Sequence, residues 1–161
     1  MTIRVGGLFV CFVHTITKQL VCEIADSMDV PDDTEIVYTS VSTPGHHVLE
    51  TLLDEGVPIT QLVSITPEMG AAAGVAKYTD FSGIAETYDL PLYYPETYSM
   101  DDSDVAFFEE LDADLMIVNG WNRIIPGAVL ETFEYGVLGN HGSAFGLPKG
   151  RGRSPLNWSL I

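Results

Sequence analysis

The stretch Asp114-Leu-Met-Ile-Val-Asn119, followed by Gly120-Trp-Asn-Arg-Ile-Ile-Pro126, decides the fold class of this chain. Its first part is a short apolar run, typical of a strand that is buried on both faces. Proline favours the first turn of a helix, so Pro126 indicates a helix that runs to about Phe133. A strand, a loop and a helix in this order predict one unit of a sheet with parallel strands.

Strands and helices alternate along the rest of the chain. Ile3 to Val13 is a near-continuous apolar run that predicts a buried strand of a parallel sheet, and a helical apolar stripe spans about Thr15 to Met28. We further expect strands at 35–41, 59–65, 90–94 and 136–139, helices at 47–55, 81–88 and 101–111, and a loop with at most one helical turn over 66–79. This order predicts an α/β fold with a doubly wound, mostly parallel sheet, and the whole chain, 1–161, as one domain.

The composition is strongly acidic, with seven Lys and Arg against 23 Asp and Glu and a formal net charge of −16. Such a charge repels DNA and RNA phosphates except at a local basic patch. It is typical of proteins from a high-salt (halophilic) cytoplasm, with an ordinary acidic protein as the alternative. We expect a cytoplasmic protein without a membrane partner, because no signal peptide is evident. Cys11 and Cys22 are expected to be buried thiols in a reducing compartment.

Polar residues follow two of the expected strands. Asn119 to Arg123 follows one strand and Asn140 to Ser143 follows the next, so both should lie at the carboxyl edge of the sheet, where ligands bind. His141 there is suited to act as a general base or acid near neutral pH. Asn140 is suited to donate a hydrogen bond to a developing oxyanion, and Ser143 to hold the histidine ring.

Nearly half of the cations gather after this histidine. Lys149, Arg151 and Arg153 alternate with glycines, which makes a donor-rich loop suited to a negative substrate group; alternatively, they are loop charges that pair with the acidic surface. Gly6-Gly7 builds neither a dinucleotide-binding nor a phosphate-loop pattern. His46-His47 has no third ligand at a suitable spacing, so no metal site is predicted.

The stretch from Gly139 to Trp158 resembles the core motif of the folate-dependent formyltransferase family, roughly N-x-H-x-S-L-L-P-x-x-R-G-x-x-P. This family includes methionyl-tRNA, glycinamide ribonucleotide and sugar-amine formyltransferases. Asp114 to Pro126 is similar to the family's DLIVV-x-G-x-x-x-ILP segment, and 81–94 to the helix that leads into its GIPVY strand. The resemblance covers about Phe81 to Ile161 and is only general before that. The ending Arg-Gly-Arg-Ser-Pro-Leu-Asn-Trp158 is most similar to the sugar-amine branch.

The resemblance implies a Rossmann-like formyltransferase domain that transfers a formyl group from 10-formyltetrahydrofolate to an amine. It implies that His141 helps to deprotonate the attacking amine and to stabilise the tetrahedral intermediate, and that Ser143 supports the surroundings of the histidine. A nucleotide-sugar amine or similar small amine is expected as acceptor in preference to methionyl-tRNA. The pterin is expected against the loop formed by Gly120, Trp121, Asn122, Arg123, Ile124 and Ile125. The acceptor is expected near Lys149, Arg151 and Arg153, whose positive charges suit a phosphate group on the acceptor.

Three departures from the family pattern qualify this expectation. The family's asparagine stands two residues before its histidine, where this chain has Gly139. Neighbouring strand residues point to opposite faces, so Asn140 can replace that asparagine only if a bulge re-aims it. The loop from Ala144 is longer than the common pattern. The family's catalytic aspartate falls well beyond its histidine, so we expect an incomplete N-terminal part that is inactive alone. A non-catalytic folate- or nucleotide-binding module is the alternative.

Overall fold

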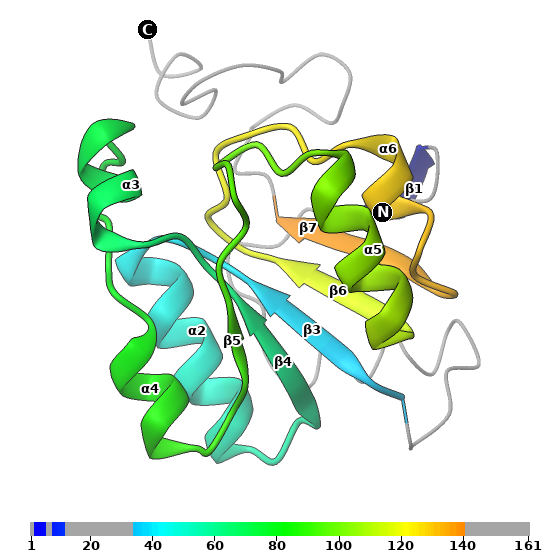
Figure 1. The fold of residues 1–161 in the computed structure, drawn as a ribbon. Helices are drawn as coiled ribbons and strands as arrows, with labels where there is room; N and C mark the ends of the chain where they lie inside the picture. Colours follow the sequence, from blue (N-terminus) through cyan, green and yellow to red (C-terminus); the bar gives the residue numbers. More distant parts are fainter. Residues whose placement is uncertain (1, 6–7, 12–33, 141–161) are drawn as a thin grey trace, which may run out of the picture.

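The structure, a computed structural model, describes residues 2–5, 8–11 and 34–140. Over these residues the chain forms one seven-stranded sheet in the order β1-β2-β7-β6-β3-β4-β5 (Figure 1). The strands are β1 (Thr2–Val5), β2 (Leu8–Cys11), β3 (Ile36–Thr39), β4 (Ile59–Val63), β5 (Leu92–Tyr93), β6 (Leu115–Val118) and β7 (Gly136–Asn140). The helices are α2 (Thr43–Asp54), α3 (Pro67–Ala72), α4 (Ser82–Thr87), α5 (Asp102–Leu111) and α6 (Gly127–Leu130). Every neighbouring pair of strands is parallel except β1 and β2, which are antiparallel.

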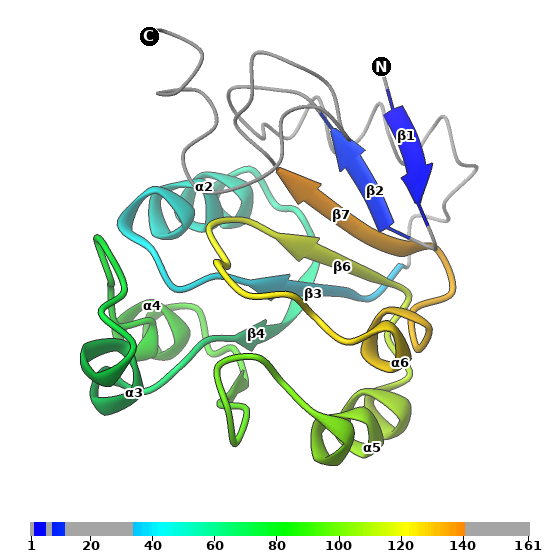
Figure 2. The same cartoon turned by 90° about the horizontal axis from the view of Figure 1, so that it is seen from above.

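The sheet is covered by helices on both faces, which confirms the doubly wound α/β fold (Figure 2). Alternate residues of the buried strands supply the two cores, as the period of two of a strand requires. In β6, Leu115 and Ile117 join the core that contains Leu49 of α2 and Ile84 of α4. Met116, between them, joins the opposite core, which includes residues of α5 and α6. Both faces of the strand are therefore apolar, which explains its uninterrupted apolar sequence.

The N-terminal run is organised differently from the prediction. One buried parallel strand was expected over Ile3 to Val13, but the structure has two strands, β1 and β2, which pair antiparallel with Thr2 opposite Cys11. Only β2 continues the parallel sheet, by pairing with β7. The single-strand prediction was wrong because an apolar composition does not show where a run divides, and here the pairing of β2 with β7 decides it. The helix expected from Thr15 to Met28 lies outside the described residues.

Capping residues explain where two helices begin. The helix predicted from His47 begins earlier, at Thr43, because the Ser42 side chain accepts a hydrogen bond from the Gly45 N–H and a proline occupies the first turn. Within the segment expected to be mostly loop, α3 begins at Pro67 after the capping residue Thr66. In the described part of the chain, no helix combines the length and the apolarity needed to cross a membrane.

The topology brings the two polar strand ends together. β6 and β7 are parallel neighbours, and Val118 is paired with Gly139. β3 lies on the other side of β6, with Thr39 opposite Val118. The carboxyl ends of β3, β6 and β7 therefore share one edge of the sheet (Figure 1). This is the edge at which open α/β sheets bind their ligands.

Candidate functional site

The segment after β6 is held against β3 from its first residue. The Asn119 N–H donates to the Thr39 carbonyl at 3.0 Å, which extends the β6–β3 ladder by one step. Gly120 then adopts φ +80°, a left-handed conformation that favours glycine. A Cβ at this position would overlap Ser42 Oγ and lie 3.1 Å from Ser42 Cβ. The backbone at Gly120 therefore approaches the start of α2 more closely than any other residue type would allow.

The turn between β3 and α2 forms the other half of this close contact. Ser40 and Ser42 are buried, at 1% and 7% exposure. Ser40 Oγ accepts from the Ser42 N–H at 3.3 Å, and Ser42 Oγ accepts from the Gly45 N–H at 3.3 Å. A Cβ at Gly45 would overlap Ser40 Oγ and lie 2.7 Å from the Asn119 carbonyl oxygen. The turn between β3 and α2 and the segment after β6 therefore interlock through Gly45 and Gly120, which leaves the backbone there little room to move.

A buried tyrosine supports the same turn from inside the sheet. The Tyr38 hydroxyl donates to the Gly45 carbonyl at 2.8 Å. Burial holds the pKa of the Tyr38 phenol well above its ordinary value, and a hydrogen bond from the Asn119 side chain opposes this only in part. The phenol therefore stays neutral and keeps its proton to donate.

Tyr98 contacts three successive residues of the loop that follows Gly120. Its ring packs edge-on against Trp121, with the centroids 5.0 Å apart and the planes at 74°. Its hydroxyl oxygen accepts from the Asn122 N–H at 3.2 Å. The Arg123 guanidinium lies over the ring, 5.1 Å from its centroid. Nothing in the sequence signalled Tyr98, because it reaches the loop only through tertiary packing.

The loop offers both apolar and polar groups to a ligand. The Ile124 side chain is 89% exposed, and Asn122 and Arg123 are exposed beside it. Trp121 is buried, and its Nε1–H has no hydrogen-bond partner among the described residues. A flat heteroaromatic ligand needs an apolar wall and a few hydrogen-bonding groups. The residues present fit that requirement, and the assignment of Gly120 to Ile125 to cofactor binding stays a prediction.

Of the other predicted site residues, only Asn140 lies among the residues that the structure describes. Asn140 is the last residue of β7, one position beyond the Gly139–Val118 pair, so the strand delivers it to the same edge as Gly120. The remaining candidates lie outside the described residues, and their roles stay predictions: His141, Ser143, Lys149, Arg151 and Arg153.

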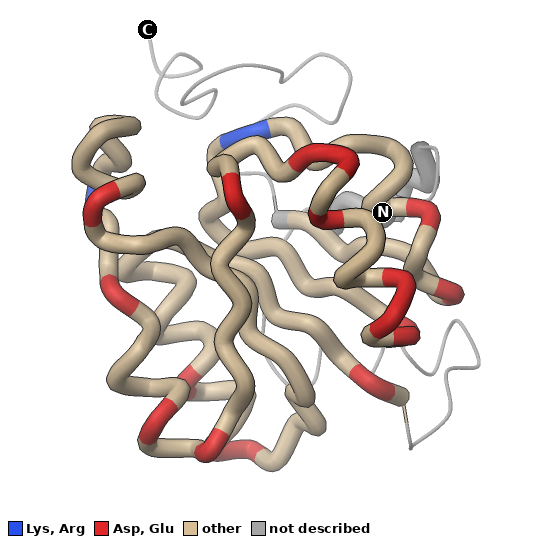
Figure 3. The backbone as a smooth tube through the Cα atoms, viewed as in Figure 1, with Lys and Arg blue, Asp and Glu red and all other residues tan. Residues whose placement is uncertain are grey.

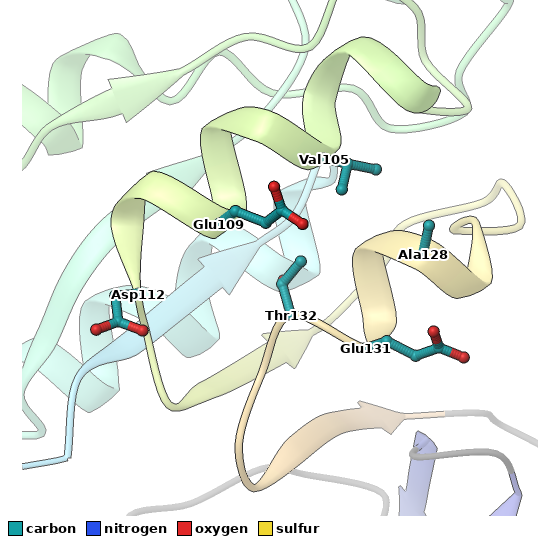
Figure 4. A pocket seen from close by; sticks show the side chains of 6 residues that line it. All are labelled: Val105, Glu109, Asp112, Ala128, Glu131 and Thr132. Atoms are coloured by element: carbon teal, nitrogen blue, oxygen red, sulfur yellow. The ribbon is translucent and has the colours of Figure 1, made fainter.

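A hollow elsewhere on the described surface lies between α5 and α6 (Figure 4). Three carboxylates line it, from Glu109, Asp112 and Glu131. Asp112 and Glu131 follow the ends of their helices and precede the next strands, so they lie toward the amino edge of the sheet, away from the loop after β6. No group of side chains in the described part of the chain has the arrangement of a metal site.

Comparison with known proteins agrees with this geometry. The family model described as formyl transferase matches residues 36–161. The match extends upstream of Phe81, where the sequence resembles the family only in general, and it includes β3 and α2. The methionyl-tRNA formyltransferase of Alkaliphilus oremlandii is 28% identical over 127 residues, which are 79% of this chain and 40% of that protein.

Two further relatives carry the same name. The methionyl-tRNA formyltransferase of Synechococcus elongatus is 30% identical over 114 residues, 70% of this chain and 34% of that protein. That of Clostridium perfringens is 33% identical over 78 residues, 48% of this chain and 25% of that protein. The matches thus span two fifths or less of the length of these relatives. The family match covers most of the chain and all of the strand ends described above, and the chain therefore belongs to the formyl transferase family.

Proposed function

We propose that the protein containing this chain transfers a formyl group from 10-formyltetrahydrofolate to an amine. The observation that carries the proposal is the meeting of two segments at one sheet edge. The loop Gly120 to Ile125 follows β6, and Asn140, at the end of the neighbouring β7, leads directly into His141. The family membership of residues 36–161 supports the same chemistry.

Each segment has a separate task in this proposal. The donor supplies the one-carbon group, and the loop holds its flat ring against Ile124 and the backbone beside Trp121. The interlock at Gly120 keeps that wall in one position, so the donor is oriented rather than merely retained. As the amine nitrogen bonds to the formyl carbon, His141 receives the proton that the amine loses, and Ser143 supports the imidazole. The bond from the formyl carbon to N10 of the donor then breaks, and N10 takes up a proton as tetrahydrofolate leaves. Lys149, Arg151 and Arg153 are positively charged, and in this proposal they bind a negatively charged group of the acceptor.

We further propose a small amine, such as a nucleotide-sugar amine, as the acceptor, with methionyl-tRNA as the second candidate. Binding of tRNA needs cations that neutralise several phosphates. Between residues 34 and 140, however, Lys77 and Arg123 are the cations, whereas Asp and Glu occur on all the helices but α6 and on most of the connections (Figure 3). The names of the relatives favour the second candidate, methionyl-tRNA.

The acceptor is tested by competition. The protein, expressed from its complete natural reading frame, is given 10-formyltetrahydrofolate with a nucleotide-sugar amine and methionyl-tRNA together, and formylated products are measured. We expect a higher kcat/KM for the sugar amine, and loss of both activities in His141→Ala. A higher kcat/KM for methionyl-tRNA would reverse the order of the acceptors. Undiminished formyl transfer by His141→Ala would overturn the assigned mechanism.

One observation favours a non-catalytic alternative. Gly139, paired with Val118 in the sheet, occupies the position of the family's asparagine and has no side chain to offer. A folate-binding module without turnover is consistent with that substitution. Calorimetry with 5-formyltetrahydrofolate and turnover with added amine separate the two functions, because binding without any product would replace the enzyme by the module.

A further inference from the structure

We infer that Tyr98 is a positioning residue that sets the conformation of the loop Trp121 to Arg123 and, through it, the affinity for the formyl donor. The inference deepens the proposed function and rests on it, because this loop is the proposed donor-binding wall. Tyr98 lies in the connection between β5 and α5, far from the loop in sequence. It belongs to none of the motifs that indicated the family.

The contacts of Tyr98 differ in kind but converge on one short segment. The edge-on packing at 5.0 Å fixes the indole of Trp121, and the hydroxyl fixes the backbone of Asn122 through the 3.2 Å hydrogen bond. The ring also carries the Arg123 guanidinium at 5.1 Å, although Arg123 is otherwise an exposed side chain. A residue that only filled the core would need the first of these contacts, whereas the other two determine orientation.

Tyr98 can act in this way because its own segment is anchored. The Met100 N–H donates to the Thr97 carbonyl at 3.0 Å, which closes a turn around Tyr98, and Met100 is buried. Asp101 then caps α5, and its N–H donates to Asp104 Oδ2 at 2.8 Å in a reciprocal capping box.

Asp104 ties this cap to the sheet. It is fully buried, and its Oδ1 accepts from the Tyr93 hydroxyl of β5 at 2.7 Å. Tyr93 also stacks on Phe107 of α5, with the ring centroids 3.6 Å apart. Tyr98 therefore projects from a segment held at one end by the sheet and at the other by the start of a helix. Its contacts transmit a fixed position to the loop.

The substitution Tyr98→Phe isolates the orienting hydrogen bond. It retains the ring against Trp121 and Arg123 and removes only the acceptor of the Asn122 N–H. Asn122 is exposed, so water can replace the lost partner and the protein should stay folded. Tyr98→Leu removes the ring contacts as well. Tyr88→Phe is the matched control. It also removes one tyrosine hydroxyl from a hydrogen bond, because the Tyr88 hydroxyl donates to Asp54 at 2.5 Å, but this bond lies at the C-terminal ends of α4 and α2, away from the loop after β6.

The experiment uses the protein from its complete reading frame with 5-formyltetrahydrofolate as the binding probe and 10-formyltetrahydrofolate for turnover. The loss of one hydrogen bond that holds the loop should raise the donor Kd and KM of Tyr98→Phe by about three- to tenfold, with kcat nearly unchanged. Tyr98→Leu should weaken donor binding further, and Tyr88→Phe should leave both constants at the wild-type value. The part of the tryptophan emission that Trp121→Phe removes reports on Trp121, and it should shift in Tyr98→Leu before any ligand is added.

Failure of the inference and failure of the proposed function give different results. If wild type binds the probe and both Tyr98 variants bind it equally well, Tyr98 is a core residue and the inference is overturned while the function stands. If folded wild type does not bind the probe, the proposed function is overturned and this inference with it. A fall in kcat at an unchanged donor KM would also contradict a role in positioning the donor.

Discussion

Replacing Gly120 by alanine should destabilise the protein by about 2–3 kcal/mol, because the added methyl group meets two separate penalties. Gly120 has φ +80°, and this left-handed conformation costs other residues roughly 1–2 kcal/mol. The Cβ would also overlap Ser42 Oγ. Relief requires the hydroxyl to turn away from the Gly45 N–H, 3.3 Å from Oγ in the native structure, and loss of such an N-cap costs about 1 kcal/mol.

A matched glycine separates the two penalties. Gly56 has nearly the same conformation, φ +78°, but no described heavy atom lies within 4 Å of the Cβ that alanine would add. Gly56→Ala should therefore cost only the strain, about 1–2 kcal/mol, measured by urea unfolding with an unchanged m-value. In a Ser42→Ala background, the cost of Gly120→Ala should fall toward that of Gly56→Ala, with a remainder from the Cβ of residue 42, which stays 3.1 Å from the added Cβ. Equal losses for the two glycine variants with Ser42 present would refute the interlock between the loop and the start of α2.

Three further predictions concern titrating and buried groups. Hydrogen bonds from Ser103 lower the pKa of Asp101 from its ordinary 3.8. The contribution of the Asp101 carboxylate to stability should therefore be present above pH 3.8 and lost as pH falls through the lowered pKa. In urea unfolding, the stability of Asp101→Asn should fall less steeply with pH on the acid side. Burial, followed by nearby negative charges, raises the pKa of Tyr78 from 10.0 to about 12. The free energy of unfolding should therefore fall as pH rises from 10 to 12, and it should fall less steeply in Tyr78→Phe. A difference spectrum near 295 nm that shows every tyrosine ionised by pH 11 would contradict this prediction. Asp104→Ala should cost about 2–4 kcal/mol in urea unfolding, because it strands the Tyr93 hydroxyl and the capped backbone N–H; a loss below 0.5 kcal/mol, on the order of an exposed substitution, would contradict it.

Much of the architecture could be predicted because its signals are local. The apolar run before Asn119 has few stable alternatives to a strand with both faces buried, and the structure places β6 at Leu115–Val118 inside the predicted 114–119. Asp101 followed by an acidic first turn predicts a helix start, and α5 begins directly after it at Asp102. The parallel pairing of β6 with β7 follows from the helix that joins them, because a crossover is needed between parallel neighbours.

Other features needed the tertiary structure. The run Ile3 to Val13 has the composition of one buried strand, and its division into an antiparallel pair depends on which neighbour β2 finds in the sheet. The role of Tyr98 depends on contacts with residues that are distant in sequence, which no local pattern encodes. The need for glycine at position 120 likewise comes from Ser42, which reaches it across the β3–β6 pair.

The sequence by itself determined the alternation of strands and helices, the edge at which the polar strand ends meet, and the family motif, since each depends on residue type and spacing along the chain. The tertiary structure alone decided how rigid that edge is. Steric exclusion at Gly120 and the three contacts of Tyr98 fix the loop after β6, and both arise only when segments distant in sequence pack against one another.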